Sequence, residues 1–183
     1  MSDSGRRRDM GRIVKYKGIE PEIARGVFLA EGSILIGDVK IGNNSNVWFN
    51  TVIRGDLNSI RIGENVSVQD LVLIHVSRNG PPAIIGDNVT IGHKATVHGA
   101  KISNNVLVGM GAILLDGCEI GEYSVIGAGS VVTEGMKIPP YTLVVGIPAK
   151  VKKTFDKSEV ERFSHFYKEY LGLKEEYLKM EGK

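Results

Sequence analysis

Aliphatic residues recur every six positions through most of this 183-residue chain, and this period constrains the fold more than any other feature. From residue 85 they are Ile85, Ile91, Val97, then after a five-residue step Ile102, Val108, Leu114, Ile120, Ile126, Val132, Ile138 and Val144. A second, usually small residue stands two positions before each of them. A period of six is not helical; two inward residues spaced by two, then a turn, describe a short strand that ends in a corner. Three such strands per coil predict an all-β fold, a triangular parallel β-helix of hexapeptide repeats over residues 12–154.

The two ends of the chain depart from this repeat. Residues 1–11 are polar and basic and are predicted to be disordered. Residues 155–183 are predicted to form an amphipathic α-helix that packs on the β-helix, with a capping box at Ser158–Glu161 and a potential bend at Gly172. The apolar stripe of that helix comprises Val160, Phe163, Tyr167, Tyr170, Leu171, Tyr177 and Leu178.

Composition excludes several classes of function. A net charge of +2 gives no strong attraction to nucleic acid, and no 18-residue apolar run is present to span a membrane. The basic run Arg6-Arg7-Arg8 is not followed by the apolar stretch of a signal peptide. The one cysteine, Cys118, occupies a small-residue slot of the repeat, so we expect it in the core of a protein from a reducing compartment. The sequence therefore predicts a cytoplasmic protein with neither a nucleic-acid nor a membrane partner.

Three of the four histidines fall at related positions of the repeat. Arg54, His75 and His98 each directly follow an aliphatic residue of the same face, so they should stack in one column with coils about 4.8 Å apart. His75 and His98 can therefore share one metal ion. His93 lies on the adjacent face, separated from His98 by about 16 Å of extended chain, so it cannot join them within one chain. A closed three-fold ring can bring His93 of one subunit to His75 and His98 of the next, which predicts a homotrimer.

Three histidines with an open fourth position form a catalytic zinc geometry. Zinc lowers the pKa of bound water to near 7 and so supplies hydroxide at neutral pH. Iron(II) and cobalt also accept imidazole ligands, so the metal stays open. Asp70 lies one coil below His93 with Gln69 beside it, and both are placed to orient ligands or a bound water. His165, on the predicted helix, is expected to serve only the surface or packing.

The motifs that surround these histidines resemble those of the gamma-class carbonic anhydrases. The matching segments are Arg54-Gly55-Asp56, Asn65 to Asp70, His75, Ile91-Gly92-His93, His98-Gly99 and Gly146 to Lys150, within a resemblance over about residues 15–180. The resemblance implies a left-handed β-helix trimer with zinc at each subunit interface, bound by His75, His93 and His98. It also implies reversible hydration of CO2 to bicarbonate by metal-bound hydroxide.

The resemblance assigns roles to five further residues. Arg54 and Asp56 would form an intersubunit salt bridge, although a purely structural role also explains them. Gln69 would hold the zinc-bound water, with Asp70 near it. Tyr170 matches a tyrosine that reaches the site in some members, and packing explains it equally well.

The sequence departs from the family pattern at three places, and the missing proton shuttle bears on the rate of reaction. Leu57 stands where the prototype carries a glutamate, and Ser67 replaces a common asparagine. The segment from Val76 to Pro82 contains no carboxylate, whereas the prototype has a proton-shuttling glutamate there. Turnover is therefore expected to be slow or buffer-dependent.

Two other functions remain open on the sequence. Many hexapeptide-repeat proteins are acyltransferases that use one histidine as a general base toward an acyl-CoA thioester, and one fold hosts many chemistries. A catalytically silent, metal-binding trimeric scaffold is the other alternative.

Overall fold

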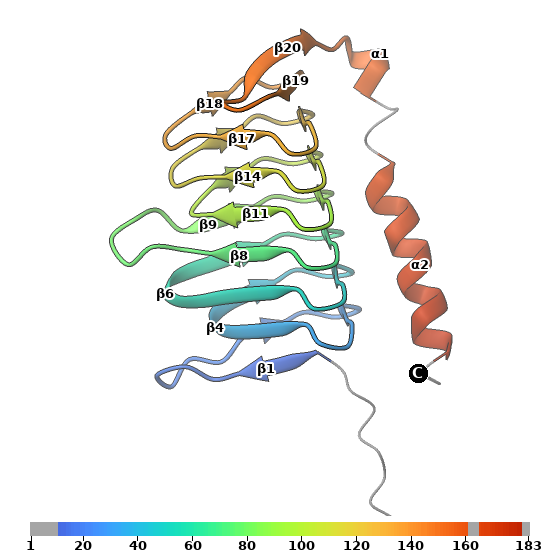
Figure 1. The fold of residues 1–183 in the computed structure, drawn as a ribbon. Helices are drawn as coiled ribbons and strands as arrows, with labels where there is room; N and C mark the ends of the chain where they lie inside the picture. The colour runs from blue at the N-terminus through green and yellow to red at the C-terminus, as the bar shows by residue number, and fades with distance from the viewer. Residues whose placement is uncertain (1–10, 161–164, 181–183) are drawn as a thin grey trace, which may run out of the picture.

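The protein is a left-handed parallel β-helix with an α-helix lying along its side, as the computed structural model of residues 11–160 and 165–180 shows (Figure 1). Short strands and corners follow one another around a triangular coil, and the coils stack along one axis. The predicted fold class is therefore confirmed. The predicted disorder of the basic N-terminus concerns residues that, apart from Gly11, lie outside the described part of the chain.

Three faces make up the β-helix, and two of them join through long strands that turn a corner. The first strands of the chain and the two long strands are β1 (Arg12–Val14), β2 (Glu22–Ile23), β4 (Ile34–Ile41) and β6 (Val52–Ile62). One face continues with β8 (Leu73–His75), β11 (Thr96–His98), β14 (Ile113–Leu114) and β17 (Val131–Val132). Another continues with β9 (Ala83–Ile85), β12 (Lys101–Ile102), β15 (Glu119–Ile120) and β18 (Lys137–Ile138). The separate third sheet holds β3 (Phe28–Leu29), β5 (Asn46–Val47), β7 (Ser67–Val68), β10 (Thr90–Ile91), β13 (Leu107–Val108), β16 (Val125–Ile126), β19 (Thr142–Val145) and β20 (Lys150–Thr154).

Aliphatic side chains of successive coils stack inside the triangle and fix the register of the strands. Ile53 pairs with Ile74, and Ile74 with Val97, and all three side chains are fully buried. Removing these side chains from water drives the coils together. Cys118 lies in the same core, where burial raises the pKa of its thiol to about 12, so it is an inert core residue as predicted.

One corner of the triangle is lined by asparagines in the left-handed backbone conformation. Asn65, Asn88 and Asn105 have φ between 55° and 58°. The Asn65 amide donates to the Asn88 side chain at 3.1 Å, and Asn88 donates to Asn105 at 3.2 Å. Asparagine tolerates this conformation better than most residues because its short polar side chain bonds locally. The corner thus gains a hydrogen-bonded ladder that runs from coil to coil.

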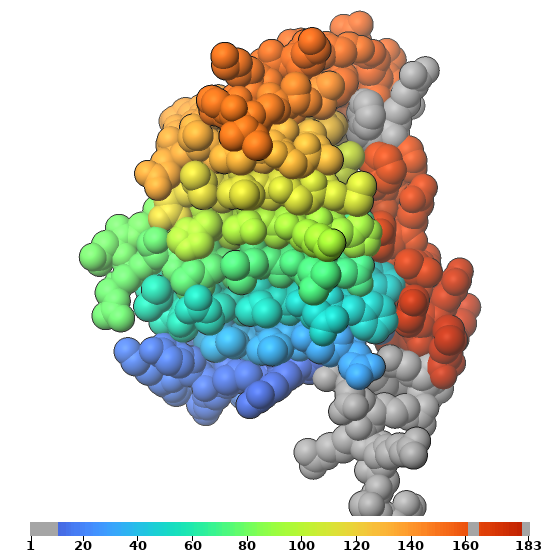
Figure 2. Space-filling view, in the orientation of Figure 1, coloured from blue at the N-terminus to red at the C-terminus, as the bar shows by residue number. Residues whose placement is uncertain are grey.

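Two insertions interrupt the six-residue repeat, one between Ile53 and Ile62 and one between Ile74 and Ile85. The register between β4 and β6 shifts so that Gly37 pairs with Gly55 but Val39 pairs with Ile60. The second insertion is the loop from Val76 to Pro82 between β8 and β9, which projects from the body in green in Figure 2. The first insertion lies within β6 and the second follows β8, the strand that ends at His75.

The C-terminal segment contains α1 (Lys157–Val160) and α2 (Phe166–Met180). The predicted capping box is wrong by two residues, because α1 starts at Lys157 and the Glu159 carboxylate accepts a hydrogen bond from the Asp156 amide at 3.0 Å. Helix α2 runs through Gly172 without a break. The predicted stripe residue Phe163 lies outside the described residues.

Helix α2 packs on the third sheet through aromatic side chains, as predicted. Tyr170 and Tyr177 contact Trp48 edge-on, with ring centroids 5.5 and 5.3 Å away. The buried Lys174 ammonium donates to the Gly26 carbonyl at 2.6 Å, which offsets the cost of burying its charge. No helix among the described residues is long and apolar enough to cross a membrane.

The asparagine ladder yields a test of the fold. Asn88→Ala should lower the free energy of unfolding by about 2 kcal/mol, because alanine is strained at this φ and the two amide hydrogen bonds are lost. Asn88→Gly should lose less, since glycine adopts the conformation freely. Denaturant unfolding of both variants checks this, with the exposed loop variant Asn79→Ala as a control that should match the wild type. Equal losses for alanine and glycine at position 88 would contradict the account.

Candidate metal centre

The stacked column predicted from the repeat is confirmed for Arg54, His75 and His98. Arg54 pairs with His75 across β6 and β8, and His75 pairs with His98 across β8 and β11. The two imidazoles face each other, with His75 Nδ1 3.1 Å from His98 Nε2. Each ring therefore turns one nitrogen toward the other and one nitrogen away.

Asp56 occupies the outer side of His75. Its Oδ1 lies 3.1 Å from His75 Nε2, and its Oδ2 accepts a hydrogen bond from Arg54 Nη1 at 2.7 Å. Burial raises the pKa of Asp56, but the hydrogen bonds from Arg54 and His75 outweigh burial and hold the pKa below its usual value. The Arg54–Asp56 ion pair is formed within one chain. The intersubunit pairing implied by the family resemblance involves a second copy and stays a prediction.

Asp116 occupies the outer side of His98, and the sequence analysis missed it. Its Oδ1 lies 2.6 Å from His98 Nδ1, and its Oδ2 accepts a hydrogen bond from the Ser77 hydroxyl at 2.8 Å. Burial raises the pKa of Asp116, but the hydrogen bonds from Ser77 and His98 more than offset it, so this carboxyl is ionised at neutral pH. Asp116 stands in the turn Asp116-Gly117, one coil beyond His98-Gly99, but this place in the repeat does not fix the direction of its side chain, so the sequence contains no sufficient signal for it.

The third histidine lies at a different corner, beside α2. His93 Nδ1 is 2.7 Å from Asp70 Oδ2, and His93 Nε2 is 3.3 Å from the Tyr170 hydroxyl. Burial, followed by the nearby Asp70 and Glu169 charges, raises the pKa of Tyr170, so its hydroxyl keeps its proton as a donor. Gln69 is buried, and its Oε1 accepts a hydrogen bond from the His93 backbone amide at 3.0 Å. The placement of Asp70 and Gln69 next to His93 therefore matches the prediction from the repeat. Tyr170 both contacts His93 and packs on Trp48.

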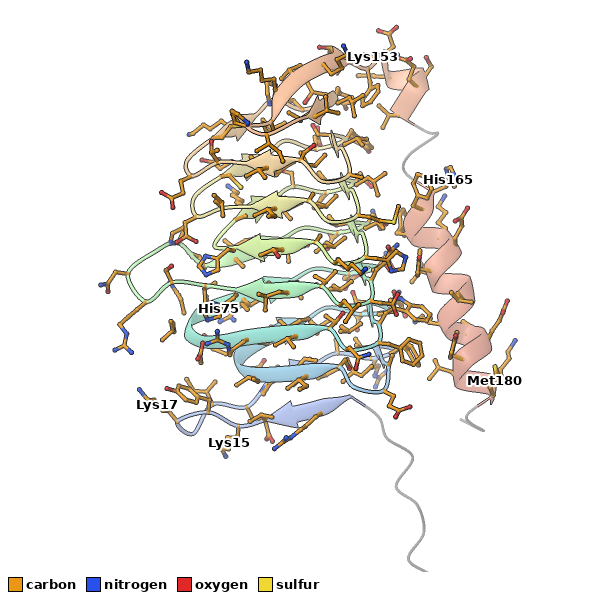
Figure 3. All side chains as sticks on the ribbon, in the orientation of Figure 1. Lys15, Lys17, His75, Lys153, His165 and Met180 are labelled. Atoms are coloured by element: carbon orange, nitrogen blue, oxygen red, sulfur yellow. The ribbon has the colours of Figure 1, made fainter. Side chains whose placement is uncertain are left out.

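The two half-sites stay apart within one chain. Among residues 11–160 and 165–180, no group of three or more histidine, cysteine or acidic side chains is arranged to hold a metal ion. Figure 3 shows His75 on the side of the β-helix away from α2, whereas His93 contacts Tyr170 of that helix. His165 is half-exposed beside Phe166, with its ring stacked at 4.8 Å, in keeping with the predicted surface or packing role.

The His75–His98 pair fits a cation. Ionised carboxylates accept only, so Asp56 and Asp116 take the N–H protons on the outer nitrogens and leave lone pairs on the inner ones. Burial lowers the pKa of His75 and outweighs the opposing effect of Asp56, which favours the neutral ring a metal requires. Two lone pairs facing each other at 3.1 Å repel unless a cation lies between them. Two nitrogens bound to one tetrahedral zinc ion are about 3.3 Å apart, close to the observed spacing.

Comparisons with known proteins show the family of the chain. The chain matches the family described as bacterial transferase hexapeptide (six repeats) over residues 20–55 and 99–134. It is 49% identical to a carbonic anhydrase of Geobacillus kaustophilus over 87% of each chain. It is also 36% identical to the mitochondrial gamma carbonic anhydrase 2 of Arabidopsis thaliana, covering 84% of this chain and 57% of that one. The chain belongs to the gamma-class carbonic anhydrase family.

Membership of the gamma carbonic anhydrase family makes this chain a carbonic anhydrase-like enzyme of the lyase class. A solved structure from Bacillus cereus described as a candidate acetyltransferase is 41% identical, with a TM-score of 0.90 over 94% of this chain and 99% of that one. That similarity agrees with the β-helix fold described above.

Proposed function

We propose that this protein hydrates CO2 reversibly to bicarbonate at metal sites shared between the subunits of a homotrimer. The observation that carries the proposal is the pairing of each histidine with its own carboxylate. His75 pairs with Asp56, His93 with Asp70 and His98 with Asp116. Such partners fix the tautomer and ring orientation of metal-binding histidines. The fourth histidine, His165, lies 3.8 Å from the Glu169 carboxylate, a longer contact than those of the three proposed ligands, which are all within 3.1 Å.

The metal would be held by His75 and His98 of one subunit and His93 of the next. Three neutral imidazoles would leave the cation its full charge, and a metal held there would supply the means to lower the pKa of a water molecule toward neutrality. Zinc fits this donor set, and iron(II) or cobalt would also accept it.

Gln69 and Tyr170 are proposed to act on the substrate side of the site. The oxygen of the Gln69 amide is occupied by the His93 backbone, so Gln69 meets a water or substrate through its NH2 group, as a donor. The Tyr170 hydroxyl donates to His93 Nε2 in the single chain. When His93 uses this nitrogen as a ligand, the Tyr170 hydroxyl must turn to another acceptor, and bicarbonate offers one.

A largely apolar, partly exposed strip, with Leu73 and Ile113 as its most exposed members, supports the homotrimer. Outward-facing residues of the face that carries His75 align from coil to coil; they are Val52, Leu73, Thr96, Ile113 and Val131. Leu71 is half-exposed directly after Asp70 and is held at a φ of 60°, a conformation that costs a leucine free energy. A second copy of the chain is the occupant we propose for this surface, because it would bury the strip and complete the metal site together.

We place this enzyme in the cytoplasm, with small molecules and its own copies as its partners. The free, buried Cys118 suits a reducing compartment.

The metal-binding proposal predicts the effect of removing a ligand. His93→Ala should lower the rate of CO2 hydration by at least about 100-fold, because one of the three metal ligands is gone. Loss of a residue that only hydrogen-bonds to a ligand typically costs about 10–100-fold. His165→Ala, which removes the fourth histidine, should leave the rate unchanged. Stopped-flow measurement of CO2 hydration and metal content check both. Full activity in His93→Ala, or in wild-type protein stripped of metal by a chelator, would contradict the proposal.

The shared site predicts that two inactive variants can restore each other. His93→Ala and His98→Ala damage opposite halves of the site, so each alone should bind little metal. In a mixed trimer, one of the three interfaces joins an intact His75–His98 pair to an intact His93. Co-expression in equal amounts should therefore recover about one quarter of the wild-type sites. No recovery in trimers shown to contain both variants would rule out sharing between subunits.

The loop without a carboxylate predicts dependence on buffer. Each hydration releases a proton, and the segment from Val76 to Pro82 offers no acidic group to carry it away. Raising the concentration of an imidazole buffer should raise kcat by about tenfold or more, with little change in kcat/KM. A kcat that does not respond to buffer would show that another group transfers the proton.

The competing functions make different predictions. An acyltransferase would consume acetyl-CoA with amine or alcohol acceptors, and its rate would not fall when the metal is removed. A silent scaffold would bind metal and form the trimer without hydrating CO2. The same metal-stripped and reloaded samples discriminate all three.

A further inference from the structure

Asp116 contacts the candidate site, and neither the repeat nor the family resemblance identified it. It lies beyond β14, one coil above His98, and its carboxylate joins that histidine to the loop that starts after β8. Both carboxylate oxygens are used, one by His98 Nδ1 and one by the Ser77 hydroxyl.

The surrounding backbone makes room for this carboxylate. A Cβ atom on Gly99 would stand 2.3 Å from Asp116 Oδ1, and Gly99 also adopts a φ of 52°. A Cβ atom on Gly80 would stand 3.1 Å from Asp116 Oδ2. The Asn58 side chain donates to the Gly80 carbonyl at 3.0 Å and holds the loop from its other side. Two glycines and a secured loop therefore frame one acidic side chain against His98.

We propose that Asp116 is the positioning residue for His98, fixing the tautomer that turns the lone pair of Nε2 toward His75, with Ser77 fixing the carboxylate in turn. This inference rests on the proposed function, because it assigns His98 a lone pair for a metal. The physical reason is that an ionised carboxylate has no proton to donate, so the ring nitrogen that faces it must be the donor. The Asp116 carboxylate accepts only, so the proton of a neutral His98 must sit on Nδ1. Without the carboxylate, the proton is free to sit on Nε2 and block that nitrogen.

The hydrogen bond between Ser77 and Asp116 also links His98 to the loop from Val76 to Pro82. The segment from Val76 to Pro82 contains no carboxylate of its own, but the Ser77–Asp116 hydrogen bond brings one to its base. The ligand His98 and the loop beside it are thereby oriented by the same side chain. His75, which ends β8 two residues before Ser77, is tied into the same unit.

The test compares Asp116→Asn with the wild type in two measurements. Asparagine keeps the shape but can donate to His98 Nδ1, so the tautomer should change. Zinc and cobalt affinities, measured by competition with a chelator, should fall on the order of 10–100-fold. Long-range 1H–15N spectra of the metal-free protein should show His98 Nε2 unprotonated in the wild type and protonated, wholly or in part, in Asp116→Asn. The chain has four histidines, so a His98→Ala spectrum assigns the resonance.

Two further variants complete the design. Glu119→Gln is the matched control, because it removes one negative charge three residues from Asp116. Glu119 pairs with Lys137 on the surface, so this variant should change neither the metal affinity nor the His98 tautomer. Ser77→Ala leaves the carboxylate in place but frees one oxygen, and should weaken metal binding by less than Asp116→Asn does. If Asp116→Asn does not fold, Ser77→Ala must still show weakened binding for the proposal to stand.

The outcomes separate this inference from the proposed function. Unchanged affinity together with an unchanged His98 tautomer in Asp116→Asn would overturn the role of Asp116. A wild-type protein that binds no zinc or cobalt would overturn the shared metal site instead. In that case the tautomer of the metal-free protein still decides whether Asp116 orients His98.

Discussion

The backbone hydrogen bonds between stacked coils are the interaction on which the rest of this structure depends. Among the described strands, every pair except the antiparallel β19–β20 is parallel and joins strands of neighbouring coils. The inward aliphatic side chains allow only one register for these pairs. A slip by one residue would turn every inward side chain to the outside. The same register that buries Ile74 and Val97 therefore places His75 and His98, the next residues along, side by side on the outside.

The site arises where this regular scaffold is interrupted. One insertion follows β8 and another lies within β6. The column of Arg54, His75 and His98 therefore lies next to residues that do not follow the six-residue repeat. The scaffold holds the ligands rigidly, while the loop supplies contacts such as Ser77 to Asp116. Functional groups commonly lie on loops that a rigid framework positions.

Electrostatics gives each histidine a defined role. Asp56, Asp70 and Asp116 each lie within 3.1 Å of a ring nitrogen, so the proton of each neutral ring is held on the side facing the carboxylate. The remaining nitrogen of His75 then faces that of His98, and the remaining nitrogen of His93 faces Tyr170. One chain therefore carries two incomplete halves of a metal site, the His75–His98 pair and His93. This separation is the physical basis for proposing sites shared between subunits.

The sequence by itself determined the coil, its register and the column of His75 and His98, because a six-residue period admits only one way to bury its aliphatic positions. It also placed Asp70 and Gln69 beside His93, since residues one coil apart in the same column must be neighbours. The start of helix α1 at Lys157 and the formation of the Arg54–Asp56 ion pair within one chain were decided by local geometry that the period does not encode. Asp116 was decided only by the tertiary structure, because its carboxylate reaches His98 and Ser77 from a turn 18 and 39 residues away along the chain. No spacing rule of the repeat specifies the direction in which a corner side chain points, whereas the space left by Gly99 and the hydrogen bond from Ser77 do.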